Sequence, residues 1–271
     1  MIYISQLLPD DELSALLFRT GAGLEIVDLS IGAQLDDLPN SLSAFQRRLD
    51  ALGNPPLTLH GPFLDLNPVS WDPLIESASL ARYEQSYRAA KALGASKIVF
   101  HSCFVPNCAF LEGWAERTAA FYNRFLAEKD DHIGVVMENV FDPSPEPIRE
   151  AAQRVKHPAF GLCLDLGHAH CYSAVPVQRW ITRLAPWIRH LHIHDNCGDR
   201  DAHLAPGAGS LPFDKLVALF PREATITIEC HTYQDVLAAW RFLRRNGLSE
   251  AAPWGSFYED ASIGKEALKN Y

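Results

Sequence analysis

Nine side chains of the types that bind divalent metal ions stand at the ends of apolar segments of this sequence, or in the loops just after them. Histidine and carboxylate side chains in combination are typical ligands of zinc, manganese and cobalt. A carboxylate at the end of an apolar segment is costly to bury unless it is paired or bound to a metal. A lone histidine has ordinary structural explanations, but a converging set indicates a metal centre. The nine are His60, His101, Glu138, Asp165, His168, His192, Asp201, His203 and Glu229.

Eight apolar, β-type segments alternate with segments of helical periodicity, which predicts repeated βα units and a parallel sheet. Gly21, Gly53 and Gly94 follow the first three helical segments, where a left-handed residue typically ends a helix. Eight units favour a single closed (β/α)8 TIM barrel, of fold class α/β, over an open sheet of five or six strands. The expected strands are Ile2–Leu8, Leu24–Leu29, Leu57–His60, Lys97–His101, Ile133–Glu138, Phe160–Asp165, Ile188–His194 and Thr225–Glu229. The expected helices are Glu12–Thr20, Leu42–Leu52, Ile75–Leu93, Trp114–Lys129, Pro147–Val155, Val177–Leu184, Phe213–Phe220 and Asp235–Arg245.

A barrel of this kind gathers the carboxyl ends of all its strands at one rim, where reactive groups usually lie. Five of the nine candidates close an expected strand, and the others lie near the end of one or in the loop that follows. We therefore expect them to converge on a metal centre at this rim. Mixed imidazole and carboxylate ligands suit zinc, manganese or cobalt better than an all-oxygen magnesium or calcium site, and nine ligands suffice for one to three ions.

The bulk properties of the 271 residues predict one soluble domain. The hydrophobic content is 48%, yet no stretch approaches the roughly 20 apolar residues that a membrane helix needs. We expect a single barrel over residues 1–271, with about 250–271 as a C-terminal appendage. The sequence begins without the basic segment and cleavage site of a signal peptide, which favours a cytoplasmic location.

The charge and the cysteines narrow the choice of partners. A net charge of −9 and the lack of a basic, aromatic-rich segment make nucleic acid an unlikely partner, and leave a small-molecule substrate as the expectation. Six cysteines without paired spacing predict free thiols, mostly buried, rather than disulfides or zinc fingers. We expect no membrane partner, and the sequence leaves homo-oligomer formation open.

The candidate ligands resemble those of the superfamily of xylose isomerase-like barrels, which includes sugar and sugar-phosphate isomerases and epimerases as well as endonuclease IV. Glu138, Asp165, His192 and Glu229 match the four positions that hold a metal in the isomerase and epimerase branch. The endonuclease IV branch adds five ligands for a trinuclear zinc site. The matching residues are His60, His101, His168, Asp201 and His203, with Gly207, Gly209 and the pair Glu138-Asn139 also fitting that branch.

The resemblance implies two alternative chemistries. The first is isomerisation or epimerisation of a sugar, sugar phosphate or related polyol, in which Glu138 and Glu229 exchange a proton with the substrate and His168 orients a substrate oxygen. Val140 stands where xylose isomerase has the lysine of its hydride shift, which favours proton transfer. The alternative is a multinuclear, zinc-type phosphoester hydrolase, acting on a small molecule rather than on DNA.

Several further residues are candidates for substrate contacts. Arg200 is placed to hold a hydroxyl or phosphate, although a solvated loop arginine is the ordinary alternative. Trp71 and Phe104 follow strands that end in candidate ligands, and they would shape one face of a sugar unless they serve loop packing. His194 alternates with His192 along the same strand, and we assign it to support the ligands rather than to bind a metal.

Overall fold

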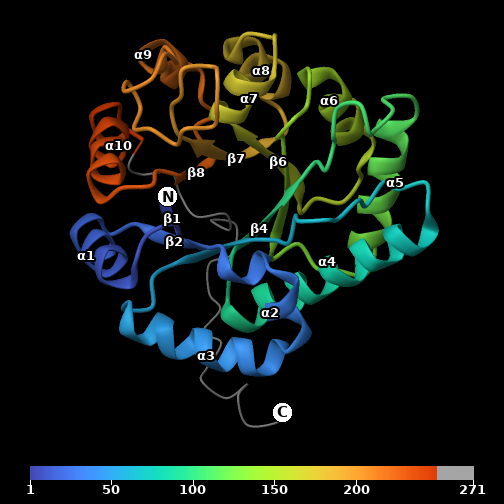
Figure 1. The fold of residues 1–271 in the computed structure, drawn as a ribbon, viewed down its shortest axis with the longest axis horizontal. Helices are drawn as coiled ribbons and strands as arrows, with labels where there is room; N and C mark the ends of the chain where they lie inside the picture. Colours follow the sequence, from blue (N-terminus) through green and yellow to red (C-terminus); the bar gives the residue numbers. More distant parts are fainter. Residues whose placement is uncertain (249–271) are drawn as a thin grey trace.

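The computed structural model describes residues 1–248, and these form a closed barrel of eight parallel strands in sequence order (Figure 1). The ring closes between the first and last strands, where Ile2 lies opposite Ile226. The predicted single (β/α)8 barrel is confirmed. The strands are β1 (Ile2–Ser5), β2 (Gly23–Ile26), β3 (Leu57–His60), β4 (Lys97–His101), β5 (Gly134–Glu138), β6 (Phe160–Asp165), β7 (Ile188–Ile193) and β8 (Thr225–Ile228).

The helices form a ring outside the strands (Figure 1). Among the described residues, no helix has the length and apolar character that crossing a bilayer requires. The α-helices are α1 (Asp10–Thr20), α2 (Gly32–Asp36), α3 (Leu38–Ala51), α4 (Pro73–Leu93), α5 (Trp114–Leu126), α6 (Pro145–Arg154), α7 (Leu166–Tyr172), α8 (Val177–Leu184), α9 (Phe213–Leu216) and α10 (Tyr233–Arg245). The short 3-10 helices are η1 (Asp28–Ser30) and η2 (Val217–Leu219).

The inside of the barrel carries apolar residues below the mouth and ligand-type residues at it. Val99, Val136 and Cys163 form a small buried cluster of their own. Successive side chains of a strand point to opposite faces, so the residues two positions later face the same way. Those residues are His101, Glu138 and Asp165, and the strand pattern alone therefore aims all three into the barrel at its carboxyl end.

Helix ends follow the local signals of the sequence. Asp72 accepts a hydrogen bond from the Leu74 backbone N–H at 2.8 Å and caps α4. Gly21 and Gly94 end α1 and α4 with φ of 66° and 70°, as the sequence predicts. Gly53 also has positive φ, 84°, but it lies one residue beyond the cap of α3.

Several predicted boundaries are wrong. The strands β1, β2, β7 and β8 stop before the expected Leu8, Leu29, His194 and Glu229, because the backbone turns over the mouth; Leu7, for example, donates its N–H to the Ser5 carbonyl at 2.8 Å. The expected helix Phe213–Phe220 is divided into α9 and η2, while α2 and α7 were not expected. The expected appendage, about 250–271, lies outside the described residues, so its form and the single domain over 1–271 stay predictions.

All six cysteines are free, as expected, but the expectation that most are buried is wrong. Only Cys163 and Cys230 are buried, because they belong to or adjoin the strands of the core. Cys108 and Cys197 are exposed in loops that follow β4 and β7.

We predict that Gly23→Ala destabilises the protein by roughly 2 kcal/mol, the range of overpacking in a filled core. A Cβ at Gly23 would lie 2.4 Å from a ring carbon of Tyr3 and 2.6 Å from the backbone oxygen of Pro56. Gly134→Ala is the matched control, since it also begins a strand and its Cβ would meet no described atom closer than 3.6 Å. Urea unfolding measures both; equal midpoints would contradict the prediction.

Candidate metal centre

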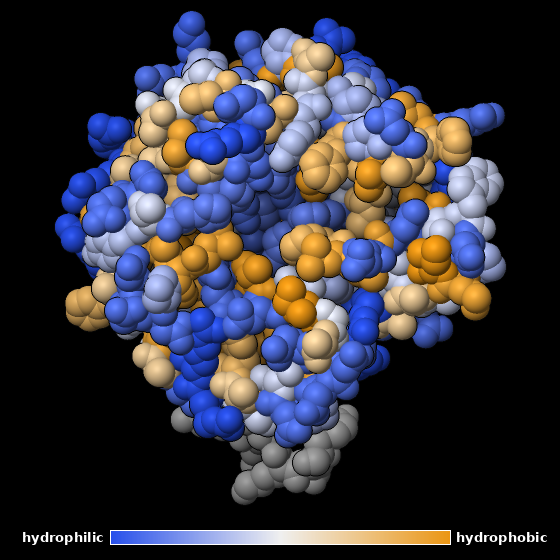
Figure 2. Space-filling view, in the orientation of Figure 1, coloured by the Kyte–Doolittle hydropathy of each residue, from blue (hydrophilic) through white to orange (hydrophobic). Residues whose placement is uncertain are grey.

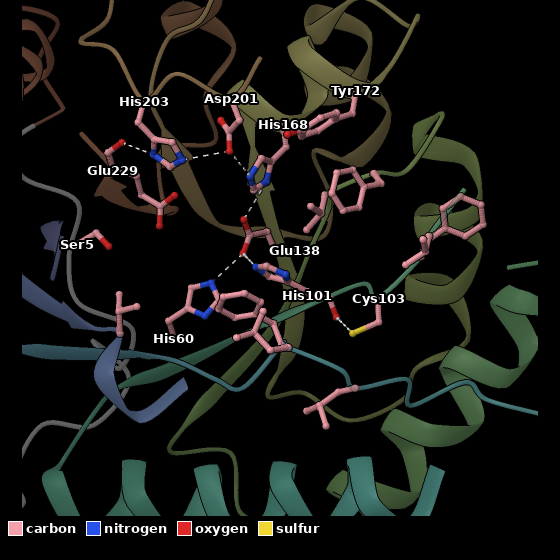
Figure 3. Close-up of a pocket in the computed structure, with 18 of the residues that line it drawn as sticks. Ser5, His60, His101, Cys103, Glu138, His168, Tyr172, Asp201, His203 and Glu229 are labelled. Atoms are coloured by element: carbon pink, nitrogen blue, oxygen red, sulfur yellow. Dashed lines mark hydrogen bonds and ion pairs between the residues drawn. The ribbon is translucent and has the colours of Figure 1, made fainter. Parts of the chain in front are cut away.

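The nine candidate ligands come together at the carboxyl ends of the strands, in a pocket of about 610 Å³. Seven of them line this pocket (Figure 3). The other two, Asp165 and His192, are fully buried and do not line it. Figure 2 shows a hollow at the centre of this face, with hydrophilic residues at its floor and hydrophobic residues around it. The sequence therefore brings these distant residues to one place.

The first of three groups within this cluster joins β3, β4 and β5. His60 Nε2 and His101 Nε2 each lie 3.5 Å from Glu138 Oε2 (Figure 3). That oxygen is buried and makes no hydrogen bond to any described residue. A tetrahedral ion about 2.1 Å from each ligand would hold the ligand atoms roughly 3.4 Å apart, so the observed spacing fits a shared ion better than direct hydrogen bonds.

The second group is centred on His192. Its Nδ1 lies 3.3 Å from Glu138 Oε1, 3.4 Å from Glu229 Oε1 and 3.8 Å from Asp165 Oδ2. Glu138 thus faces the first group with one oxygen and the second with the other. A carboxylate placed in this way can bridge two ions.

The third group is centred on Asp201, which lies in the loop after β7. Its Oδ2 is 3.3 Å from His168 Nε2 and 3.1 Å from His203 Nε2 (Figure 3). Its Oδ1 is 3.4 Å from Nδ1 of His194, whose other nitrogen lies 3.1 Å from Asp165 Oδ1. His194 is fully buried and does not line the pocket, so it connects two carboxylates of the cluster from behind.

Backbone carbonyls fix the orientation of three of the histidine rings. The Nδ1 atoms of His60, His168 and His203 lie 3.0, 3.0 and 2.7 Å from the carbonyl oxygens of Gly61, Asn139 and Glu229. A carbonyl only accepts, so each Nδ1 carries a proton, and in the neutral ring that a metal ion requires each Nε2 has a free lone pair. These Nε2 atoms point into the cluster, as metal-ligating imidazoles must.

The ends of β5 and β6 are tied together where they carry ligands. Asn139 donates its side-chain N–H to the Asp165 carbonyl at 3.0 Å and accepts the Asp165 backbone N–H at 2.9 Å. Asp165 also caps α7 by accepting the His168 backbone N–H at 2.7 Å. Gly167 leaves room for the ring of His194, which a Cβ there would approach to 2.0 Å.

Asp195 holds the loop that carries Asp201 and His203. It is fully buried, and its carboxylate accepts backbone N–H groups from Gly207 at 2.9 Å, Gly209 at 3.0 Å and Leu211 at 3.1 Å. Gly207 has φ of 91°, and a Cβ at Gly209 would lie 2.4 Å from Asp195 Oδ1. Both glycines are therefore required by the geometry of the loop.

Burial and neighbouring charges shift the pKa values of Glu138 and Glu229, which both line the pocket, in opposite directions. Burial tends to raise the pKa of Glu138, but the imidazoles of His192 and His101 outweigh it and hold this pKa well below its usual value. Burial raises the pKa of Glu229, with His192 opposing the rise and Glu138 adding to it. Two carboxyl groups whose pKa values differ in this way suit the roles of base and acid.

The pKa values of two pocket histidines, His101 and His203, are also shifted in opposite directions. Burial lowers the pKa of His101 to about 3, although Glu138 opposes the change. Burial also tends to lower the pKa of His203, but the Asp201 carboxylate raises it to about 9. The donor set of five imidazoles and four carboxylates, with buried oxygens that lack hydrogen bonds to described residues, fits divalent ions of the zinc type.

The sequence reasoning missed Glu25, which lies in the middle of β2 and is fully buried. Its Oε1 is 3.0 Å from His192 Nε2, and its Oε2 is 3.2 Å from His190 Nε2. Burial opposes ionisation, yet the imidazoles of His192 and His190 hold the pKa of Glu25 well below its usual value. The signal was present, since a carboxylate between Leu24 and Ile26 is as unusual as one at a strand end.

Two of the three residues expected to contact substrate do not line the pocket. Phe104 is buried and contributes to the wall. Trp71 is 73% exposed and lies against the guanidinium of Arg117, 4.1 Å from its ring centre. Arg200 is exposed to solvent and is absent from the pocket wall. The loops that carry these two residues turn them outward, which spacing along the sequence does not reveal.

Comparison with known proteins gives matches to both sequence and structure. The family model described as xylose isomerase-like TIM barrel matches residues 21–250. Uncharacterized protein MJ1311 of Methanocaldococcus jannaschii is 25% identical over 207 residues, 69% of this chain and 69% of that protein. Uncharacterized proteins ML2432 of Mycobacterium leprae and Mb0509 of Mycobacterium bovis match over 58% of this chain and 61% of their own length, at 27% and 26% identity.

Two solved structures have the same barrel. The TTHB071 protein from Thermus thermophilus, soaked with ZnCl2, has a TM-score of 0.72 at 25% identity and covers 90% of this chain and 97% of its own. A D-tagatose 3-epimerase-like protein has a TM-score of 0.73 at 20% identity and covers 90% of this chain and 96% of its own. The second match, at this identity, concerns the fold alone.

We predict that Asp195→Asn lowers the zinc content of the protein by about one ion per chain. An amide in place of the carboxylate loses acceptors for backbone N–H groups, at a cost of roughly 2 kcal/mol, and releases the loop that carries Asp201 and His203. Elemental analysis of protein purified without chelator gives the content. Asp199→Asn, an exposed position in the same loop, is the control; equal zinc in Asp195→Asn and the unaltered chain would contradict the prediction.

Proposed function

Because the chain belongs to the xylose isomerase-like TIM barrel family, we propose that it is a divalent-metal-dependent isomerase or epimerase of a sugar or related polyol. The observation that carries the proposal is the pair Glu138 and Glu229, whose carboxylates lie 3.3 and 3.4 Å from the same His192 nitrogen. Both line one pocket, so a substrate carbon between them would meet a carboxylate on either face. That is the arrangement that proton removal and return require.

The chemistry follows from these two groups. A divalent ion in the cluster would polarise a substrate carbonyl and so make the adjacent C–H acidic. One glutamate then takes this proton, and the other delivers a proton to the opposite face or to the neighbouring carbon. His168, held by the Asn139 carbonyl, would orient a substrate oxygen. Val140 also lines the pocket and offers no acid or base, in agreement with proton transfer by the glutamates.

The charge of the pocket wall favours an unphosphorylated substrate. Among the described residues that line the pocket there is no lysine or arginine. A phosphate remote from the reacting carbons would therefore find no lysine or arginine side chain, and the exposed rim residue Asp65 would repel it. Of the sugars, sugar phosphates and polyols that the sequence leaves open, we favour the uncharged ones.

A second candidate function is hydrolysis of a phosphoester. It is favoured by one observation, the presence of three adjacent ligand groups where an isomerase needs only the group around His192. Clustered ions would orient a water molecule and stabilise both oxygens of the displaced phosphate. We rank it second because the described pocket wall lacks the lysine and arginine side chains that normally hold the rest of a phosphodiester.

We predict that the zinc- or manganese-loaded protein exchanges a carbon-bound hydrogen of a ketose with solvent. In D2O, proton NMR should show the signal of the hydrogen next to the carbonyl disappear as deuterium replaces it, and signals of a new epimer or aldose appear. A chelator should abolish both changes. Glu229→Gln should slow the exchange at least 100-fold, in the range of general acid–base catalysis. Glu128→Gln, an exposed glutamate outside the pocket, serves as the control. Phosphate release from phosphoesters without any exchange would contradict the proposal and support the second candidate.

We also predict that His60→Ala separates the two functions. His60 belongs to the first group and lies outside the one around His192. An isomerase that needs only the latter should lose less than about tenfold in rate, whereas a multinuclear hydrolase should lose several hundredfold or more. The comparison is made at saturating metal by NMR and by phosphate release; an exchange reaction lost as completely as in Glu229→Gln would count against this assignment of roles.

A further inference from the structure

His192 presents a different ring nitrogen to the cluster from three of its neighbours. His60, His168 and His203 bind a carbonyl through Nδ1 and turn Nε2 to the cluster. His192 faces the carboxylates with Nδ1, so its Nε2 points away from the mouth into the barrel. When Nδ1 acts as a ligand, Nε2 carries the proton and needs an acceptor there.

Inside the barrel the backbone carbonyls of the strands already accept hydrogen bonds from neighbouring strands, so a side chain must supply the acceptor for Nε2. The carboxylate of Glu25 meets the need from β2, across the barrel from β7. Its Oε1 lies 3.0 Å from His192 Nε2, and both side chains are fully buried. Neither atom has a hydrogen bond of regular geometry to a described residue, so Nε2 and Oε1 are left facing each other at this distance.

The other oxygen of Glu25 is fixed from three directions. Thr58 and Thr227 each donate a hydroxyl to Oε2 at 2.9 Å, and His190 Nε2 lies 3.2 Å from it. These partners come from β3, β8 and β7. The carboxylate is therefore anchored by Oε2, and Oε1 is held in place for His192.

We propose that Glu25 is a positioning residue of the metal centre, which fixes the ring of His192 and strengthens Nδ1 as a donor by accepting a hydrogen bond from the Nε2–H group. It acts on the ion only through His192 and does not line the pocket. The inference rests on the metal centre of the proposed function. Carboxylates that support a ligating histidine in this way typically change metal affinity by 10- to 100-fold.

The test is the zinc affinity of the full chain, measured by competition with a chromogenic chelator, together with the absorption spectrum of the cobalt-loaded protein. Glu25→Gln preserves the size of the side chain and removes its charge. We expect zinc to bind roughly 10- to 100-fold more weakly and the cobalt bands to shift, because the ring of His192 is no longer held. A purely structural role would leave the cobalt spectrum unchanged.

Thr58→Val is the matched control, since it removes one hydrogen bond to Oε2 and leaves the contact between Oε1 and His192. It should keep the zinc affinity within about threefold and the cobalt spectrum unchanged. Unaltered affinity and spectrum in Glu25→Gln would overturn the inference, and so would equal losses in the two variants. If Glu25→Gln does not fold, Glu25→Asp, whose shorter side chain withdraws from His192, should give the same loss.

The unaltered chain separates this inference from the proposal on which it depends. If it binds no zinc, the metal centre itself is wrong and the role of Glu25 falls with it. If it binds zinc tightly and the Glu25 variants do so equally, the metal centre stands and only the positioning role is overturned.

Discussion

The cost of burying charge at the barrel mouth governs the rest of this structure. Glu25, Glu138, Asp165 and Glu229 are all at most 7% exposed, and a carboxylate transferred from water to such a site is unstable without compensation. Imidazoles provide part of it, because His192 alone contacts all four carboxylates within 3.8 Å. Divalent ions would provide the remainder, since several of the oxygens have no hydrogen bond to described residues.

A rigid scaffold is what makes this concentration of charge tolerable. Most of the ligands stand on buried strands, and backbone carbonyls orient the rings of His60, His168 and His203. Asp201 and His203 lie instead in the long loop after β7. The buried carboxylate of Asp195 stabilises this loop, because it accepts three backbone N–H groups from residues that follow His203 in the chain. The ligand side chains are therefore ordered when the protein folds, before any metal ion or substrate binds, as in preorganised sites.

The sequence predicted the barrel and its mouth because both follow from periodicity. Strands such as Lys97–His101 and Phe160–Asp165 are apolar runs whose ends are marked by ligand residues, and their bounds agree with the structure. Residues that depend on contacts across the barrel were harder to find. Glu25 acts on His192, which is remote in sequence, and the outward turn of Trp71 and Arg200 depends on loop conformation. Period and spacing carry no information about either.

By their resemblance to the superfamily, residues of this ligand set match both its isomerases and its hydrolases, so the ligand set alone does not decide the reaction. The decision lies in groups that do not touch the ions. A hydrolase of nucleic acid must bind a polyanion on both sides of the scissile phosphate, which requires cationic side chains near the mouth. The described wall instead consists of ligands, apolar residues such as Phe63 and Phe141, and the acidic Asp65. Such a wall is in keeping with the proposal of a small uncharged substrate, which would be enclosed by it and bound chiefly at its reacting end.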